Sequence, residues 1–178
     1  MLKSKCDTNS SGRLRQAGSI FAAILLVCAS LLAVGCTSVS KEEQLEALEG
    51  RWEISEMLTT PRGDFTETLR SRYDEGPTLT FRTSESPRFT LRGVPSEADQ
   101  EPLNVQGRVE IIAANELVLA VDSEREAVWV FDFETGTRLT LRARPGPFGP
   151  APVLAILLPT FSWTENDGAT LLLERLPD

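Results

Sequence analysis

The side chains that could perform acid–base or metal chemistry in this sequence are almost all carboxylates. The 178 residues include 26 Asp and Glu but no histidine, which removes the commonest general base and zinc ligand. Two acidic runs, at 73–76 and 165–168, could offer carboxylate oxygens to calcium. Neither has the Asp-x-Asp-x-Asp-Gly spacing of an EF-hand loop. We therefore interpret both runs as polar turns and expect no metal site and no cofactor.

Catalysis by a carboxylate pair is not supported either. Glu53 and Glu56 lie three residues apart on a predicted strand, so we expect them to face opposite sides of it. The sequence has no G-x-S-x-G nucleophile motif and no phosphate-binding loop. The formal charge of −8 argues against nucleic-acid binding. We predict a protein that is not an enzyme, with no catalytic residues.

The first 36 residues have the pattern of an exported protein. Four basic residues precede an apolar run at 20–32, and that run is shorter than the roughly 20 residues of a spanning helix. Small residues at 33–35 then lead to Cys36. The segment resembles a bacterial lipoprotein signal, which implies cleavage before Cys36 and attachment of lipid to its sulfur. The alternative is an uncleaved N-terminal anchor.

This interpretation divides the chain into a signal peptide (1–35), a lipidated tether (36–40) and a folded domain (41–178). The expected location is the cell envelope, more specifically the outer membrane facing the periplasm, because Thr37 stands where some organisms use aspartate for inner-membrane retention. Cleavage leaves 14 basic and 25 acidic residues, a formal charge of −11. That charge is expected to repel anionic headgroups, so the domain itself need not touch the membrane.

Beyond the tether, the hydrophobic period changes from 3.6 to 2. Ser40 and Glu43 have capping-box spacing for a short helix that Gly50 ends. Apolar alternation then predicts eight strands, at 51–58, 77–83, 88–93, 104–112, 117–121, 126–133, 137–143 and 169–176. The first strand should place Trp52, Ile54 and Leu58 on one side. The short connections favour an all-β fold, an antiparallel up-and-down meander closed as a barrel or folded as a sandwich.

Two stretches and one glycine interrupt this pattern. Residues 59–76 form a long polar connection, with a weak strand or helical turn expected near 66–72. The segment 144–163 opens with a Pro/Gly-rich stretch, 145–152, that we expect not to be helical. Its unbroken apolar run can cap the barrel, line its mouth or form an exposed patch for a partner, and we favour the cap. The residues concerned are Val153, Leu154, Ile156, Leu157 and Leu158. Gly107 is expected to mark a bulge or kink in its strand.

Residues 48–52, Leu-Glu-Gly-Arg-Trp, carry a G-x-W signature at the junction of the predicted helix and first strand. They resemble the lipocalins and related calycin-type barrels, and the META-domain family opens in a comparable way. The resemblance implies that Trp52 closes one end of a barrel of about eight strands. It also implies an arginine from near the last strand packed over Trp52, which Arg175 matches and Arg142 could supply instead.

The aromatic side chains are the best candidates for a ligand pocket. If Trp52 points inward, strand alternation turns four others inward with it. The five candidates are Trp52, Phe81, Phe89, Trp129 and Phe131. An eight-stranded barrel has room either for a filled core or for one small ligand. We therefore expect a lipocalin-like barrel that binds a small apolar ligand, or alternatively a solid-core protein that docks on an envelope partner through the segment 144–163.

Overall fold

The computed structural model describes residues 39–121 and 125–177 of the chain. The predicted signal peptide and Cys36 lie outside the described residues. The described residues belong to one compact unit, Val39–Asp178, which contains the whole sheet and the hydrophobic core.

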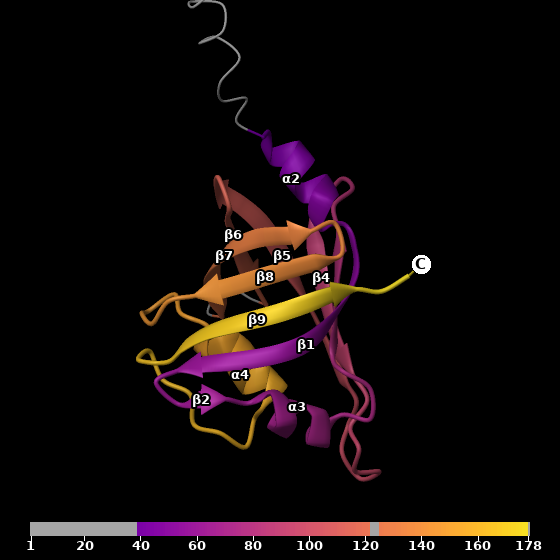
Figure 1. Ribbon diagram of the computed structural model, residues 1–178, viewed down its shortest axis with the longest axis vertical. Coiled ribbons are helices and arrows are strands. Elements are labelled where there is room, and N and C mark those ends of the chain that lie inside the picture. Colours follow the sequence, from indigo (N-terminus) through magenta and orange to yellow (C-terminus); the bar gives the residue numbers. More distant parts are fainter. Residues whose placement is uncertain (1–38, 122–124, 178) are drawn as a thin grey trace, which may run out of the picture. The chain divides into compact units, whose positions relative to one another are not determined.

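Eight antiparallel strands of the described chain form a closed barrel (Figure 1). They are β1 (Gly50–Thr60), β3 (Thr78–Arg82), β4 (Arg88–Gly93), β5 (Leu103–Ala113), β6 (Glu116–Ala120), β7 (Glu126–Thr135), β8 (Arg138–Ala143) and β9 (Gly168–Arg175). Each strand from β3 onward pairs with the next, and β9 returns to pair with β1. The predicted all-β up-and-down barrel is confirmed, and closure through β9 and β1 excludes the sandwich. A two-residue strand, β2 (Gly63–Asp64), pairs with the end of β1.

Helix α2 (Lys41–Leu48) begins at the predicted capping box. The Ser40 hydroxyl accepts from the Glu43 amide at 3.1 Å, and the Ser40 amide donates to the Glu43 carboxylate at 2.8 Å. Gly50, at φ +125°, then turns the chain into β1, a conformation that favours glycine. Figure 1 shows α2 at one end of the barrel, and α3 (Thr66–Arg72) and α4 at the other.

The prediction that residues 145–152 are non-helical is wrong at its end, because α4 spans Ala151–Leu157. Pro152 lies in the first helical turn, where a backbone N–H has no partner within the helix, so proline is tolerated there. Val153, Leu154, Leu157 and Leu158 are buried, and Ile156 is half-buried against the core. The favoured role of a cap at the barrel end agrees with this placement, whereas an exposed apolar patch does not.

A bulge in β1 corrects two further expectations. The pairing of β1 with β9 shifts between Ile54 and Glu56, which inserts one residue into the alternation. Met57 is therefore fully buried, while Leu58, predicted to point inward, is 38% exposed. The same shift places both Glu53 and Glu56 on the outer side of the barrel, instead of on opposite faces.

Candidate functional site

The five aromatic candidates all point into the barrel, as the alternation predicts. None is more than 3% exposed. Around Trp52 the interior is filled, because its ring lies 6.1 Å from that of Phe133, which in turn lies 5.9 Å from Phe131. Trp129 is the one tryptophan among the described residues whose buried indole N–H has no acceptor in the described structure.

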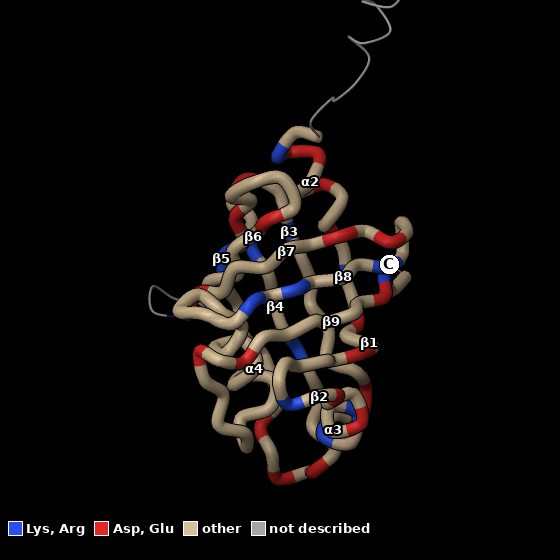
Figure 2. Tube along the Cα trace, turned by 60° about the vertical axis from the view of Figure 1, so that its left-hand side comes forward, with Lys and Arg blue, Asp and Glu red and all other residues tan. Residues whose placement is uncertain are grey.

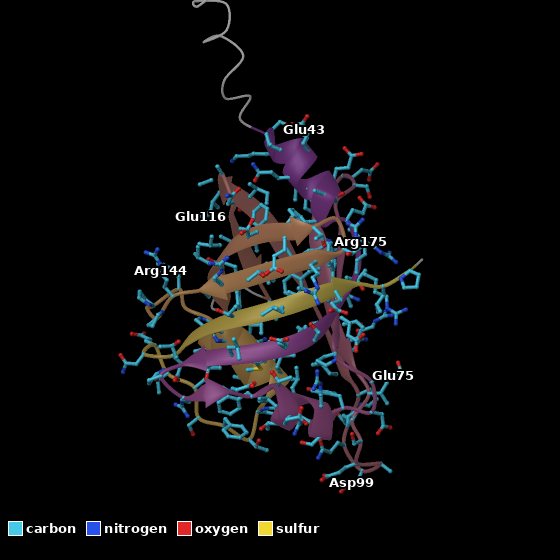
Figure 3. The ribbon with its side chains drawn as sticks, viewed as in Figure 1. Glu43, Glu75, Asp99, Glu116, Arg144 and Arg175 are labelled. Atoms are coloured by element: carbon cyan, nitrogen blue, oxygen red, sulfur yellow. The ribbon has the colours of Figure 1, made fainter. Side chains whose placement is uncertain are left out.

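Trp52 and Arg175 tie α2 to the barrel. The Trp52 indole N–H donates to the Leu48 carbonyl at 2.8 Å. The Arg175 guanidinium lies 4.6 Å from the centre of the Trp52 ring, close enough for a cation–π contact, and donates to the carbonyls of Ala47 and Glu49. Arg142 instead faces Asp132 at 3.6 Å. Of the two arginines that the sequence offered, Arg175 therefore covers Trp52; Figure 3 labels it.

A cleft of about 880 Å³ lies beside α2. Its walls come from α2, the β3–β4 turn, β5, the end of β6 and the start of β7. Half-buried Leu45 of α2 faces this space together with Val109 and Ile111, which continue into the core. Charged side chains also line the cleft. Arg108 pairs with Glu126 at 3.0 Å, and the strand register places Ala120 between them.

Gly107 connects this cleft with the aromatic interior. A Cβ at this position would collide with the Phe89 ring and with the Ala120 carbonyl oxygen. The register with β4 runs unbroken through Phe89 and Gly107, so the predicted bulge is wrong. The glycine instead leaves room for the Phe89 ring, so this predicted pocket residue lies directly behind the cleft wall. None of the five aromatic candidates lines this cleft, although Phe81 lines a separate one of about 650 Å³.

The opposite end of the barrel is held by polar contacts. The Tyr73 hydroxyl donates to the Leu157 carbonyl at 2.8 Å, and burial raises the pKa of Tyr73. The Arg62 guanidinium lies 2.7 Å from the Asp167 carboxylate, whose side chain is 2% exposed. Its hydrogen bond lowers the pKa of Asp167, and bonds from Thr164 act in the same direction. Half-buried Phe65, Phe161 and Trp163 pack around this pair, with ring centres 5.0 to 5.9 Å apart.

These contacts identify the acidic run 165–168 as a structural turn, because the Asp167 carboxylate in this run accepts hydrogen bonds from Thr164 and Arg62. Within residues 39–121 and 125–177, no cluster of three or more acidic, histidine or cysteine side chains is placed to hold a metal ion. None of the helices described is long and apolar enough to cross a membrane.

No family model matches the chain, and no curated protein matches it. One solved structure, described as "Structure of EF1p2_mFAP2b bound to DFHBI", is similar over 77% of this chain and 100% of its own, with 15% sequence identity and a TM-score of 0.43. A similarity this distant carries no argument about the ligand of the present chain.

The sequence did not predict the cleft. It forms where α2 packs beside β5, and strand alternation does not specify that contact. The available signal was Gly107 in an otherwise regular strand, which we interpreted as a bulge. Leu45, one of two leucines on a short helix rich in charged residues, was a second hint.

Proposed function

We propose that this protein binds a small apolar ligand reversibly and does not catalyse a reaction. The cleft beside α2 carries this proposal. Its volume of about 880 Å³ lies within the range of roughly 300–1,000 Å³ common for small-molecule sites. Half-buried Leu45 supplies apolar surface, and Val109 and Ile111 line the cleft although they are almost fully buried. Charged residues around them can fix the orientation of a polar end of the ligand.

The position of α2 makes this cleft a formed site rather than a gap left by a loose helix. The capping box fixes the start of the helix, and Trp52 and Arg175 hold its last turn to the barrel. A wall held in place before binding reduces the entropy lost when the ligand binds. We expect the apolar part of the ligand to contact Leu45.

The proposed setting is the cell envelope, with the chain anchored by lipid on Cys36 at the outer membrane, facing the periplasm. The sequence pattern at 1–36 supports this part of the proposal. Docking on an envelope partner through 144–163 is less favoured, because the apolar side chains of α4 are turned into the barrel.

The test uses the compact unit 39–178, which contains the complete barrel and core. The combined fluorescence of Trp52, Trp129 and Trp163 is titrated with a panel of fatty acids and neutral apolar ligands. Trp52 bonds to α2, which forms one wall of the cleft. Mass spectrometry of the purified protein tests for retained lipid. Saturable binding that Leu45→Glu weakens at least tenfold is the expected result.

Leu58→Glu is the matched control, because it places the same charge on a partly exposed leucine of β1 that does not line the cleft. It should bind as the unsubstituted protein does. The cleft would be excluded as the ligand site if no ligand of the panel binds. It would also be excluded if both variants remain folded and lose the same amount of ligand affinity.

A further inference from the structure

The outer face formed by β3, β4 and β5 has an unusual charge for so acidic a protein. Where these strands pair with one another, nine side chains point outward, and none is a carboxylate. Four are arginines, Arg82, Arg88, Arg92 and Arg108, and the other five are threonine, asparagine or glutamine. Figure 2 marks the basic and acidic positions along the chain. We refer to these nine positions as the arginine face.

Three of the arginines stand directly opposite one another. Arg82 pairs in register with Arg88, and Arg88 pairs with Arg108. Like charges at directly opposite positions of neighbouring strands destabilise a sheet. Arg108 is compensated by Glu126, whereas Arg82, Arg88 and Arg92 form no ion pair with any described residue. Carboxylates border the face: Glu85 lies in the turn between β3 and β4, Glu110 one step further along β5, and Glu53 on β1.

We propose that the arginine face docks on a membrane surface that carries anionic phospholipid headgroups. Guanidinium groups bind phosphate through paired N–H donors, and the threonine, asparagine and glutamine side chains between them can donate further hydrogen bonds. Near an anionic bilayer each basic residue strengthens binding by about fivefold. The overall negative charge suggested repulsion from such a surface, but the charge is unevenly distributed, and this face is positive.

The position of the face beside the start of α2 favours a membrane over other polyanions. Arg88 and Arg108 line the same cleft as Lys41, in the first turn of α2. Only two residues, Thr37 and Ser38, lie between Cys36 and Val39, so an extended chain reaches roughly 10 Å over these three steps. An anchor at Cys36 would therefore hold the arginine face close to the bilayer. The membrane-docking proposal rests on the same lipid anchor as the proposed function, but it does not depend on the ligand cleft.

Vesicle sedimentation of the unit 39–178, which carries no lipid, tests the proposal. Vesicles of phosphatidylcholine alone are compared with an equal mixture of phosphatidylcholine and phosphatidylglycerol, at low and high salt. We expect binding to the anionic vesicles only, weakened by salt because bulk ions screen the attraction. The double variant Arg82→Gln/Arg92→Gln should reduce the partition coefficient by about 25-fold.

Neither substituted residue lines the 880 Å³ cleft, so the double variant should keep its ligand binding. A double variant that replaces Arg138 and Arg144 changes the net charge equally on the opposite side of the barrel, where Figure 3 labels Arg144, and should lose much less binding. Three outcomes overturn the proposal: no binding of anionic vesicles at low salt, equal loss in both double variants, or binding of soluble polyphosphate without binding of vesicles. Conversely, Leu45→Glu should weaken ligand binding at least tenfold and leave vesicle binding within about fivefold of the unsubstituted protein.

Discussion

The two ends of the barrel are closed in different ways. At the α4 end, an apolar helix turns its side chains into the core, and Tyr73 and the Arg62–Asp167 pair hold the surrounding loops. A small cleft of about 190 Å³ lies near that helix. At the α2 end, the helix is attached through Trp52 and Arg175, yet a cleft of about 880 Å³ lies along its side.

This difference indicates that the α4 end contributes mainly to stability, whereas the α2 end provides space for a ligand. A helix that buries three apolar side chains contributes mainly to the core, and its surroundings leave little space for a ligand. Helix α2, attached through its last turn, contributes less burial but leaves a cleft along its side. Binding sites commonly lie in such regions of lower local stability. The following substitutions test this contrast, from the largest expected effect to the smallest.

Replacing one leucine by alanine at each end of the barrel should lower the free energy of unfolding by unequal amounts. Leu154 is fully buried in α4, so Leu154→Ala should lower the free energy of unfolding by about 3 kcal/mol. Leu45 in α2 is half-buried, and Leu45→Ala should cost only about 1 kcal/mol. Urea unfolding of the unit 39–178 measures both values. Equal losses would contradict the contrast between the two ends.

Asp167 should make the α4 end sensitive to acid. Hydrogen bonds from Arg62 and Thr164 lower its pKa in the folded state, so the folded protein binds a proton less readily than the unfolded chain does. The resulting stability is present above the unfolded pKa of about 3.9 and is lost as the pH falls through the lower folded value. Since its side chain is 2% exposed, Asp167→Asn should cost about 2 kcal/mol at neutral pH.

The measurement is urea unfolding at pH 7 and at acid pH, where the difference between Asp167→Asn and the unsubstituted protein should narrow. Glu174→Gln is the control, because Glu174 pairs with Arg138 at an exposed position. Loss of an exposed pair should change the stability by no more than about 0.5 kcal/mol. If the difference in unfolding free energy between Asp167→Asn and the unsubstituted protein stays constant with pH, the ionisation of Asp167 does not contribute to stability.

The strands could be predicted from the sequence because each carries a regular apolar alternation. The predicted limits of the strand at 88–93 agree with β4, and most others differ by one or two residues. The bulge at Ser55 could not be predicted in this way, since an inserted residue leaves the local composition unchanged. The helix α4 was missed because its apolar run has no polar residue to reveal a period.

The candidate site was harder to predict than the barrel. The inward direction of Phe89 follows from alternation along β4, but its position against Gly107 depends on the pairing of β4 with β5. The row of Arg82, Arg88 and Arg108 likewise depends on two registers, which single-strand patterns do not specify. Sequence periodicity thus predicted which side chains point inward, whereas contacts between elements determine the cleft and the arginine face.

Loosening the start of α2 should affect binding more than folding. Ser40→Ala removes the hydroxyl that accepts from the Glu43 amide and should cost about 1 kcal/mol of helix stability. Because α2 forms one wall of the cleft, we expect the affinity for an apolar ligand to fall while the barrel keeps its cooperative unfolding. Fluorescence titration and urea unfolding of the same sample separate the two effects. Unchanged affinity with a frayed α2 would show that the helix is not a wall of the site.

Arg88→Gln should have the smallest effect on stability, and in the opposite direction. Arg88 stands between Arg82 and Arg108 in the strand register and has no ion-pair partner among the described residues. Its removal should therefore raise the free energy of unfolding by about 0.5 kcal/mol. The gain should shrink at high salt, where exposed charges are screened, and Arg144→Gln should show no gain. If Arg88→Gln instead lowers the free energy of unfolding, Arg88 stabilises the fold through packing at the α2 end. The row of like charges would then not destabilise the sheet, and binding would not be needed to explain it.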